Sequence, residues 1–200
     1  WKVAEQAKAQ GATFTLTNAP IAMRMGEIQK LADACNATVI PADATSVEDL
    51  ENLITQSMEI LGGKIDFILH SIGMSPNVRK GKPYDGTNYD WYHKTMDVSA
   101  MSLHKVLQVS KKMDAISEWG SVVALTYIAA QRVFPDYNDM ADAKSLLESI
   151  TRSFGYHYGE ANKVRINTIS QSPTVTTAGS GVKGFDAFIN YAEDMSPLGN

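Results

Sequence analysis

The stretch SVVALTYIAAQRVFPDYNDMADAKSLLES, residues 121–149, decides the fold prediction for this chain of 200 residues. Its apolar run from Val122 to Leu125 indicates a buried β-strand, because aliphatic residues continue there without a polar break. A turn containing Pro135 follows, and the next residues predict a helix over 136–158. A strand of this kind feeding a helix is typical of parallel sheets with both faces covered.

The same alternation of apolar runs and helical segments extends outward in both directions. Strands are predicted at 12–17, 37–43, 64–71, 120–126 and 163–170, and helices at 1–10, 24–36, 46–61, 89–116 and 136–158. A long irregular stretch, rich in proline and glycine, is expected at 74–89. The order of elements predicts an α/β protein with a Rossmann-like, doubly wound parallel sheet in three αβα layers.

The composition is that of an ordinary globular domain, with 44% hydrophobic and 20% charged residues. Its length suits one domain, so residues 1–200 are assigned to a single dinucleotide-binding and catalytic domain. The net charge of −4 gives no electrostatic case for nucleic-acid binding. A single cysteine, Cys35, excludes a disulfide framework and a thiolate zinc site, so a reducing cytoplasm is the expected location. No apolar run approaches the roughly 18 residues of a membrane span, and the histidines lack metal-ligand spacing, so neither membrane nor metal is expected.

Tyr137 and Lys144 carry the chemical prediction of the opening stretch. On the predicted helix they are about two turns apart, which places them on one face, roughly 10 Å apart along the axis. A phenol that donates a hydrogen bond and a long cation nearby can stabilise negative charge on a substrate oxygen. A surface tyrosine and a solvated lysine remain the commoner explanation for such a pair.

Polar residues also follow most of the predicted strands at the point where each ends. Asp43 follows the second strand, His70-Ser71-Ile72-Gly73 the third, Tyr127 the fourth and Gln171-Ser172-Pro173 the fifth. Because ligands of doubly wound sheets bind outside the carboxyl ends of the strands, we expect these residues to gather at one ligand-binding edge.

The segments ADATSVEDL, FILHSIGMSP and RINTISQSPTVTTAGSGVKGF, together with Tyr127, Tyr137 and Lys144, resemble one family. It is the NAD(P)H-dependent enoyl-acyl-carrier-protein reductase of bacterial type II fatty acid synthesis, a branch of the short-chain dehydrogenase/reductase superfamily. Commoner members of that superfamily use Tyr-x-x-x-Lys, whereas here Ala141 stands four positions after Tyr137. The longer tyrosine–lysine spacing, with a second tyrosine ten residues upstream, is the pattern of the enoyl reductase branch.

The resemblance implies reduction of the trans-2 double bond of an enoyl thioester by hydride transfer, with three catalytic residues. Tyr137 would contact the thioester oxygen, and Lys144 would hold the hydroxyls of the nicotinamide ribose. Tyr127 would line the pocket and help to place the thioester. A packing residue at a strand end is the plainer alternative for Tyr127.

The resemblance also implies a cofactor site. Its residues would be Asp43, Ala44, Ser71, Ile72, Gly73, Lys144, Pro173, Thr174 and Thr176. Asp43 would hold the adenine amino group, although an N-cap for the helix near Ser46 explains the same residue equally well. NADH is preferred, and NADPH is possible, because no basic pair follows the first predicted strand.

Substrate contacts are implied at Ser75, Tyr127, Met140, Ala178 and Phe185. The substrate would be carried on acyl carrier protein, which is acidic, and Arg79, Lys80, Lys82 and Lys183 are candidates for a basic docking patch. The family's assembly implies a homotetramer, in which helices 97–117 and 136–158 pair across an interface.

Some features of the family pattern differ or are expected outside the chain. Gln171-Ser172 replaces the Ala-Gly common before the proline. The glycine-rich pyrophosphate turn would precede residue 1, and the last strand would follow residue 200, so the chain is expected to be an internal segment.

Two other functions remain open from the sequence. One is a carbonyl reductase or alcohol dehydrogenase of the wider superfamily, against which the missing Tyr-x-x-x-Lys argues. The other is a non-catalytic nucleotide-binding module, which would bind cofactor without turnover.

Overall fold

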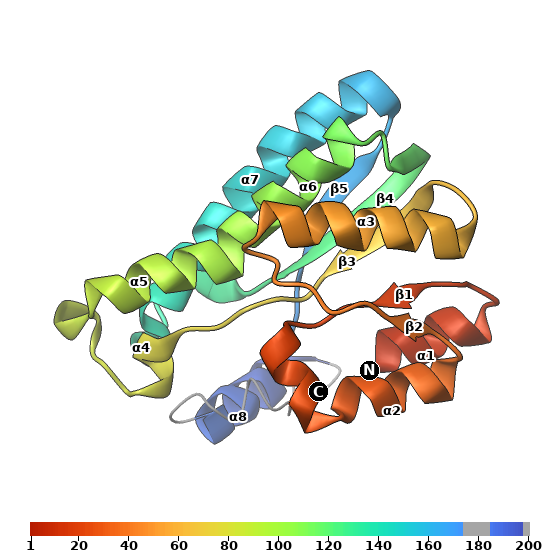
Figure 1. The fold of residues 1–200 in the computed structure, drawn as a ribbon. Helices are drawn as coiled ribbons and strands as arrows, with labels where there is room; N and C mark the ends of the chain where they lie inside the picture. Colours follow the sequence, from red (N-terminus) through yellow and green to blue (C-terminus); the bar gives the residue numbers. More distant parts are fainter. Residues whose placement is uncertain (174–184, 198–200) are drawn as a thin grey trace. The chain divides into compact units, whose positions relative to one another are not determined.

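The computed structural model describes residues 1–173 and 185–197, and it has an α/β architecture (Figure 1). The α-helices are α1 (Lys2–Ala9), α2 (Glu27–Cys35), α3 (Val47–Leu61), α4 (Pro76–Arg79), α5 (Tyr89–Met96), α6 (Ser102–Lys112), α7 (Asn138–Asn162) and α8 (Phe185–Met195). The strands are β1 (Thr15–Leu16), β2 (Thr38–Val39), β3 (Ile65–His70), β4 (Ile116–Thr126) and β5 (Arg165–Ser170). Short 3-10 turns lie at η1 (Pro20–Met25), η2 (Tyr84–Gly86), η4 (Ile128–Ala130) and η5 (Pro135–Tyr137), and a π-helical turn, η3, lies at Asp97–Met101.

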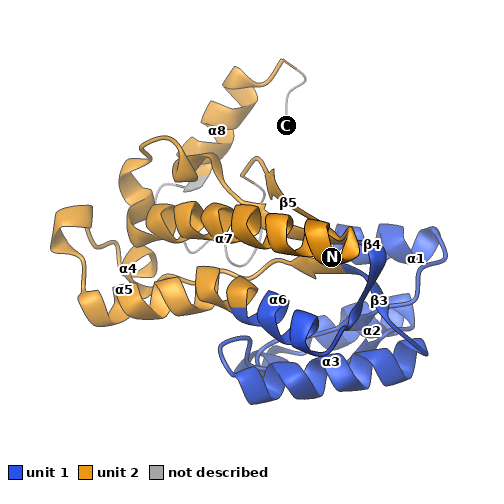
Figure 2. Cartoon of the chain, turned by 90° about the horizontal axis from the view of Figure 1, so that it is seen from above, with its two compact units in different colours: residues 1–67, 105–120 blue, residues 68–104, 121–200 orange. Residues whose placement is uncertain are grey.

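The chain divides into two compact units (Figure 2). Unit 1 comprises residues 1–67 and 105–120, and unit 2 comprises residues 68–104 and 121–200. Within the described residues, β1 and β2 form one sheet, and β3, β4 and β5 form a second sheet in that order. The assignment of residues 1–200 to one domain stays a prediction.

Unit 1 is organised around helix α3. The helix begins where the Ser46 side chain accepts a hydrogen bond from the Asp49 amide at 3.2 Å, and it ends at Gly62, whose φ is +76°. Its buried residues Leu50 and Ile54 pack with residues 109 and 115 in a small apolar core. Serine is favoured at a helix N-cap because its hydroxyl accepts from a free backbone amide, and glycine is favoured after the last turn because it adopts positive φ. The bounds of the helix therefore follow from local chemistry.

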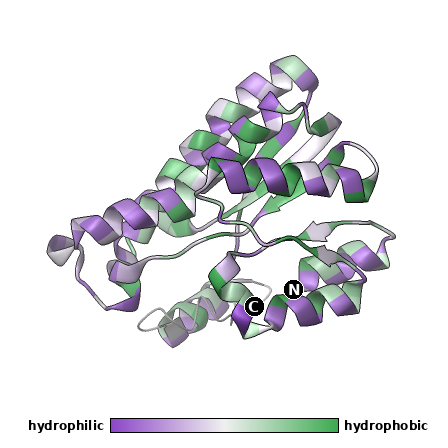
Figure 3. Ribbon diagram, viewed as in Figure 1, coloured by the Kyte–Doolittle hydropathy of each residue, from purple (hydrophilic) through white to green (hydrophobic). Residues whose placement is uncertain are grey.

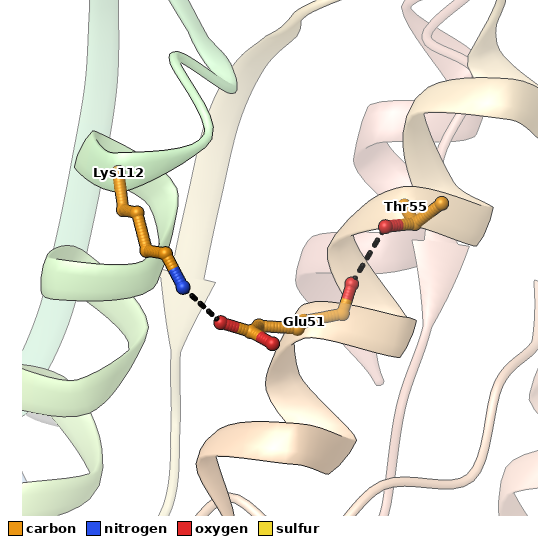
Figure 4. A network of polar contacts seen from close by, with 3 residues as sticks. All are labelled: Glu51, Thr55 and Lys112. Atoms are coloured by element: carbon orange, nitrogen blue, oxygen red, sulfur yellow. Dashed lines mark hydrogen bonds and ion pairs between the residues drawn. The ribbon is translucent and has the colours of Figure 1, made fainter.

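A surface contact joins α3 to the end of α6 within unit 1 (Figure 4). Lys112 Nζ lies 2.8 Å from Glu51 Oε1, and Thr55 Oγ1 donates to the Glu51 carbonyl at 2.8 Å. The Lys112 side chain is exposed and that of Glu51 is partly exposed, so this ion pair contributes little to stability, about 0–1 kcal/mol. The buried core, rather than the ion pair, holds the two helices together.

Strand β4 contains a tight backbone position at Gly120. The preceding Trp119 has a φ of +62°. A Cβ built on Gly120 would lie 2.5 Å from Ile116 Cγ2 and 2.8 Å from the Ser117 oxygen. Both distances are too short for any other residue, so this glycine is required by the strand itself.

Unit 2 is built on the parallel pair β4–β5, with a register from Ser121↔Arg165 to Thr126↔Ser170. Along β4, Val122 and Ala124 are fully buried, and α7, in which Leu147 is fully buried, packs against β5. Hydrophobic residues are concentrated on the strands of the β3–β4–β5 sheet in Figure 3, as expected for a covered parallel sheet. The α/β Rossmann-like fold class predicted from the sequence is therefore confirmed.

The π-helical turn η3 separates α5 from α6, a place where the sequence predicted one helix. Its Ser99 hydroxyl accepts from the Met74 amide at 2.9 Å and donates to the Met74 carbonyl at 3.1 Å. Such turns are frequent beside functional sites. Here the turn ties the segment after β3 to the helix in unit 2.

Several predicted boundaries were wrong. The strand expected at 12–17 covers only Thr15–Leu16, and the helix expected from residue 136 begins at Asn138. The irregular stretch at 74–89 contains the short helix α4, and α8 was not predicted. None of the described helices is long and apolar enough to cross a membrane. The described residues also contain no group of three or more metal-ligating side chains.

Candidate active site

Tyr127 and Tyr137 come together in unit 2. Tyr127 directly follows strand β4, and its ring centre lies 5.1 Å from that of Tyr137 at an interplanar angle of 56°. Both rings are half-buried. A tilted pair at this distance is a favourable aromatic contact, so each tyrosine helps to fix the other.

Tyr137 does not lie on the long helix, which corrects the predicted geometry. It closes the 3-10 turn η5, and the helix begins only after it, at Asn138, whose φ is +36° and ψ −134°. Asn138 Nδ2 donates to the carbonyls of Lys82 and Pro83 at 2.7 and 3.1 Å, which holds this unusual backbone. The two-turn spacing from Tyr137 to Lys144 therefore does not follow one continuous helix.

Lys144 lies inside α7, with a relative exposure of only 8%. Its Nζ donates to the Leu125 carbonyl of β4 at 2.7 Å. Burial lowers the pKa of this ammonium from its ordinary 10.5 to about 8. The burial of this side chain excludes a solvated surface lysine as the explanation of this residue.

Gly73 lies beside Lys144 and Met140. A Cβ at Gly73 would sit 3.9 Å from Lys144 Nζ and 3.7 Å from Met140 Cε, both ordinary contact distances. Gly73 is also absent from the positive-φ glycines of the described chain. The neighbouring side chains would accept a Cβ at this distance, so the protein's own packing does not require glycine here. Met140 is itself buried, and Ser71 and Ile72 precede this position in the same loop.

The two tyrosines are protonated donors at ordinary pH. Burial raises the pKa of Tyr137 well above its usual value, and the neighbouring Tyr127 adds to this effect. Burial, followed by the nearby Tyr191, raises the pKa of Tyr127. A neutral phenol donates one hydrogen bond, which is what an oxygen gaining negative charge requires.

His70 is buried at the end of β3, and its Nε2 lies 2.8 Å from Ser102 Oγ. Because the Ser102 hydroxyl donates to the Val98 carbonyl at 2.7 Å, Ser102 accepts from His70. Burial and then the charge of Lys144 lower the pKa of His70 to about 4. Burial therefore keeps this imidazole neutral, and its Nε2 is engaged by Ser102.

The hydroxyl of Ser75 is engaged by the protein. It caps α4 by accepting from the Val78 amide at 3.0 Å, and it donates to Asp139 Oδ1 at 2.6 Å. If Ser75 contacts the substrate as predicted, it does so through its backbone groups, because its hydroxyl is already bonded within the protein. Asp139 was missed from the sequence because nothing local marks it as buried.

An aromatic group extends from the tyrosine pair to α8, and it was also missed. The ring centre of Phe134 lies 5.2 Å from Tyr127, 5.6 Å from Phe188 and 6.4 Å from Tyr191. The only sequence signal was the density of aromatic residues at 127–137 and 185–191. These rings extend the aromatic contact of the tyrosine pair to α8.

Asp43 and Ala44 belong to unit 1. Asp43 Oδ1 accepts from the Thr45 amide at 2.9 Å and from the Thr45 hydroxyl at 2.8 Å. Because Ser46 caps α3, the N-cap explanation of Asp43 was wrong. Asp43 is exposed in this turn, whereas Ala44 packs against the small core of unit 1. The adenine contact stays a prediction.

The remaining predicted residues lie at the limit of the described chain. Pro173 is described, whereas Thr174, Thr176, Ala178 and Lys183 lie outside the described residues. Phe185 begins α8, but its side chain lies outside the described part. These contacts to cofactor and substrate stay predictions.

Comparison with known proteins identifies the family. A family model described as "Enoyl-(Acyl carrier protein) reductase" matches residues 1–200. "Enoyl-[acyl-carrier-protein] reductase [NADH] 2" of Rhizobium meliloti is 31% identical over 199 residues, covering 99% of this chain and 72% of its own length. The FabI enzyme of Rickettsia conorii is 32% identical over 202 residues, 99% of this chain and 75% of its own.

Solved structures agree with this assignment. The FabI–NADH complex from Alistipes finegoldii is 66% identical with a TM-score of 0.98, and the match covers all of this chain and 71% of that one. The Bacillus cereus enoyl-acyl carrier protein reductase with NADP+ is 27% identical with a TM-score of 0.89, covering 99% of this chain and 76% of that one. The chain belongs to the enoyl-acyl-carrier-protein reductase family, within the short-chain dehydrogenase/reductase superfamily.

Proposed function

We propose that this enzyme reduces the trans-2 double bond of an enoyl thioester carried on acyl carrier protein, with NADH as the hydride donor. The family assignment and the names of the relatives support the reaction and the cofactor. The observation that carries the proposal is the buried Lys144 between β4 and Gly73, with Tyr137 close to Tyr127 in the same unit. NADPH use is left to measurement, because a relative's structure holds NADP+.

The residues present fit a nicotinamide nucleotide. Lys144 offers ammonium hydrogens to ribose hydroxyls, and the neighbouring Gly73 carries no side chain that would obstruct close approach of a ligand. Ser71 and Ile72 lead into this position, and Pro173 follows β5. When bound, NADH supplies the hydride that adds to the β-carbon of the substrate.

Tyr137 stabilises the charge that this addition creates. As hydride reaches the β-carbon, negative charge develops on the thioester oxygen as an enolate. The Tyr137 hydroxyl donates a hydrogen bond to that oxygen, and its raised pKa keeps it protonated. A donor of this kind typically contributes about 3–4 kcal/mol of barrier lowering.

Lys144 has two tasks, to hold the ribose and to add a positive field near the developing charge. Its cation acts in a buried setting, where electrostatic effects are stronger than in water. Tyr127 orients the Tyr137 ring through their tilted contact and lines the thioester pocket with Phe134.

The proposal extends to assembly and location on the strength of family resemblance. The enzyme is a homotetramer of the cytoplasm, in which the basic residues Arg79, Lys80 and Lys82 face the acidic carrier protein. Arg79 and Lys80 are exposed. Charge reversal at Arg79 and Lys80 raises KM for carrier-bound substrate and leaves KM for a small thioester unchanged.

Substrate comparison tests the reaction. NADH oxidation is followed with crotonyl thioester, which has the trans-2 double bond, and with acetoacetyl thioester, which offers a ketone. Turnover of the crotonyl compound at least tenfold faster supports the enoyl reductase. Faster turnover of the ketone indicates a carbonyl reductase, and binding of NADH with no turnover of either indicates a silent nucleotide-binding module.

A further inference from the structure

We propose that Asp139 is a positioning residue that clamps the loop after β3 to the first turn of α7 and thereby fixes Tyr137 for the reaction. This inference rests on the proposed function. It concerns a buried carboxylate to which the proposed reaction gives no step.

The Asp139 carboxylate has no exposure to solvent, and both of its oxygens are occupied by donors from distant segments. Oδ1 accepts from the Ser75 hydroxyl at 2.6 Å. Oδ2 accepts from Asn77 Nδ2 at 2.7 Å and lies 2.8 Å from Thr95 Oγ1. One buried side chain therefore joins α4, α5 and α7.

The donors are themselves held in place. Asn77 is fully buried, uses a second amide hydrogen on the Asn88 carbonyl at 3.1 Å, and accepts from the Asn88 amide at 3.0 Å. Ser75 accepts from the Val78 amide while it donates to Asp139. Because each donor is oriented by another contact, the carboxylate meets a pre-arranged set rather than a mobile loop.

The clamp acts where the backbone is least regular. Asp139 is the second residue of α7, a place where a carboxylate is favoured by the helix dipole. Its neighbour Asn138 has positive φ, and its side chain is bonded to the carbonyls at 82 and 83. Tyr137 precedes this pair directly. Loss of the carboxylate would free both the loop and the turn that carries the tyrosine.

Asparagine at this position is nearly isosteric but cannot satisfy the same donors. One of the two carboxylate oxygens becomes an NH₂ group, which then faces a hydroxyl or amide donor. A buried polar mismatch of this kind costs about 1–3 kcal/mol locally. The mismatch falls on Ser75, Asn77 and Thr95, whose contacts to Asp139 are side-chain contacts.

The test compares Asp139→Asn with Asp142→Asn. Asp142 lies one turn further along α7 and accepts from the exposed Tyr84 hydroxyl at 3.1 Å, so the control removes the same charge outside the clamp. The readouts are kcat with crotonyl thioester per NADH-binding site, the Kd for NADH, and hydrogen exchange of the Val78 amide.

Asp139→Asn is expected to lower kcat about 10- to 100-fold, to leave the Kd for NADH within about threefold, and to speed exchange of the Val78 amide about tenfold. Asp142→Asn changes none of the three by more than about threefold. A kcat of Asp139→Asn within about threefold of wild type overturns the inference. Equal losses of kcat and NADH affinity also overturn it, because they would indicate a general structural defect rather than a defect in the thioester step.

Two further results, an unfolded variant and an inactive wild type, also have a defined interpretation. If Asp139→Asn does not fold, Thr95→Val replaces it. That change keeps the side-chain volume and removes the hydroxyl that lies 2.8 Å from both Asp139 Oδ2 and the Trp91 carbonyl. Unchanged Val78 exchange and kcat in this variant overturn the inference. If wild type itself does not reduce the thioester, the proposed function fails, while Val78 exchange still decides the clamp. Unchanged exchange in Asp139→Asn then overturns it, and faster exchange supports it.

Discussion

Replacing Lys144 by methionine is expected to stabilise the folded protein while removing most of its activity. The ammonium is buried with an 8% relative exposure, and burial lowers its pKa from 10.5 to about 8. At about 1.4 kcal/mol per pKa unit, the folded protein disfavours the charged side chain by about 3 kcal/mol relative to the unfolded chain. Methionine keeps the apolar stem and carries no charge.

The net gain is smaller because the hydrogen bond to the Leu125 carbonyl is lost with the amine. A typical bond of this kind contributes about 1 kcal/mol net, which leaves a stabilisation of about 2 kcal/mol at pH 7. The unfolded chain keeps the lysine proton up to about pH 10.5, whereas the folded protein releases it near pH 8. Wild-type stability therefore rises with pH across this window, and the advantage of the variant shrinks.

Urea unfolding without cofactor at pH 7 and pH 10 measures this difference. The exposed Lys80→Met substitution controls for loss of a positive charge elsewhere. The variant at position 144 should also lose about 100-fold in kcat, a stability–activity trade-off. Equal or lower stability of Lys144→Met at pH 7, or a gap that stays constant up to pH 10, would refute the reasoning.

Three further predictions concern glycines and pH. Gly120→Ala should lower the unfolding free energy by more than about 2 kcal/mol, because its Cβ would lie 2.5 Å from a side-chain carbon. Gly159→Ala in α7, with nothing within 4 Å, should be neutral or stabilising by up to about 1 kcal/mol in the same urea assay. A loss at Gly120 no larger than the loss at Gly159 would contradict the packing argument. Gly73→Ala should leave the melting temperature unchanged but weaken NADH binding about tenfold by fluorescence titration, and an unchanged Kd would show that the cofactor does not use this space. The Kd for NADH should also rise above about pH 8, as Lys144 loses its proton. Lys144→Arg should abolish that rise, since arginine stays charged, and a rise that persists in this variant would assign the titration to another group.

Local chemistry explains which parts of the fold were predictable. The helix expected at 46–61 is observed at Val47–Leu61, because the sequence places Ser46 as its N-cap and Gly62 directly after its last residue. The strand expected at 64–71 is likewise observed at Ile65–His70. The first predicted strand shrinks to Thr15–Leu16, since an apolar run shows where a strand can form but not how far a neighbour pairs with it.

In the site, too, the features set by local sequence were predictable and those set by distant contacts were not. The tyrosine and lysine types were recognisable from spacing, and the structure brings Tyr127 to Tyr137 and buries Lys144. The start of α7 was misplaced because the positive φ of Asn138 depends on bonds to carbonyls more than 50 residues earlier in the chain. The Asp139 clamp was invisible for the same reason, since its donors lie 44 to 64 residues away in sequence.

The most direct measurement of the central claim is the kcat of Tyr137→Phe with crotonyl thioester and saturating NADH, expressed per NADH-binding site. Phenylalanine keeps the ring contact with Tyr127 and removes only the hydroxyl. The account predicts a fall in kcat of about 10²-fold or more, with the Kd for NADH unchanged. A kcat within about threefold of wild type would contradict the account, because the Tyr137 hydroxyl would then not stabilise the charge on the thioester oxygen.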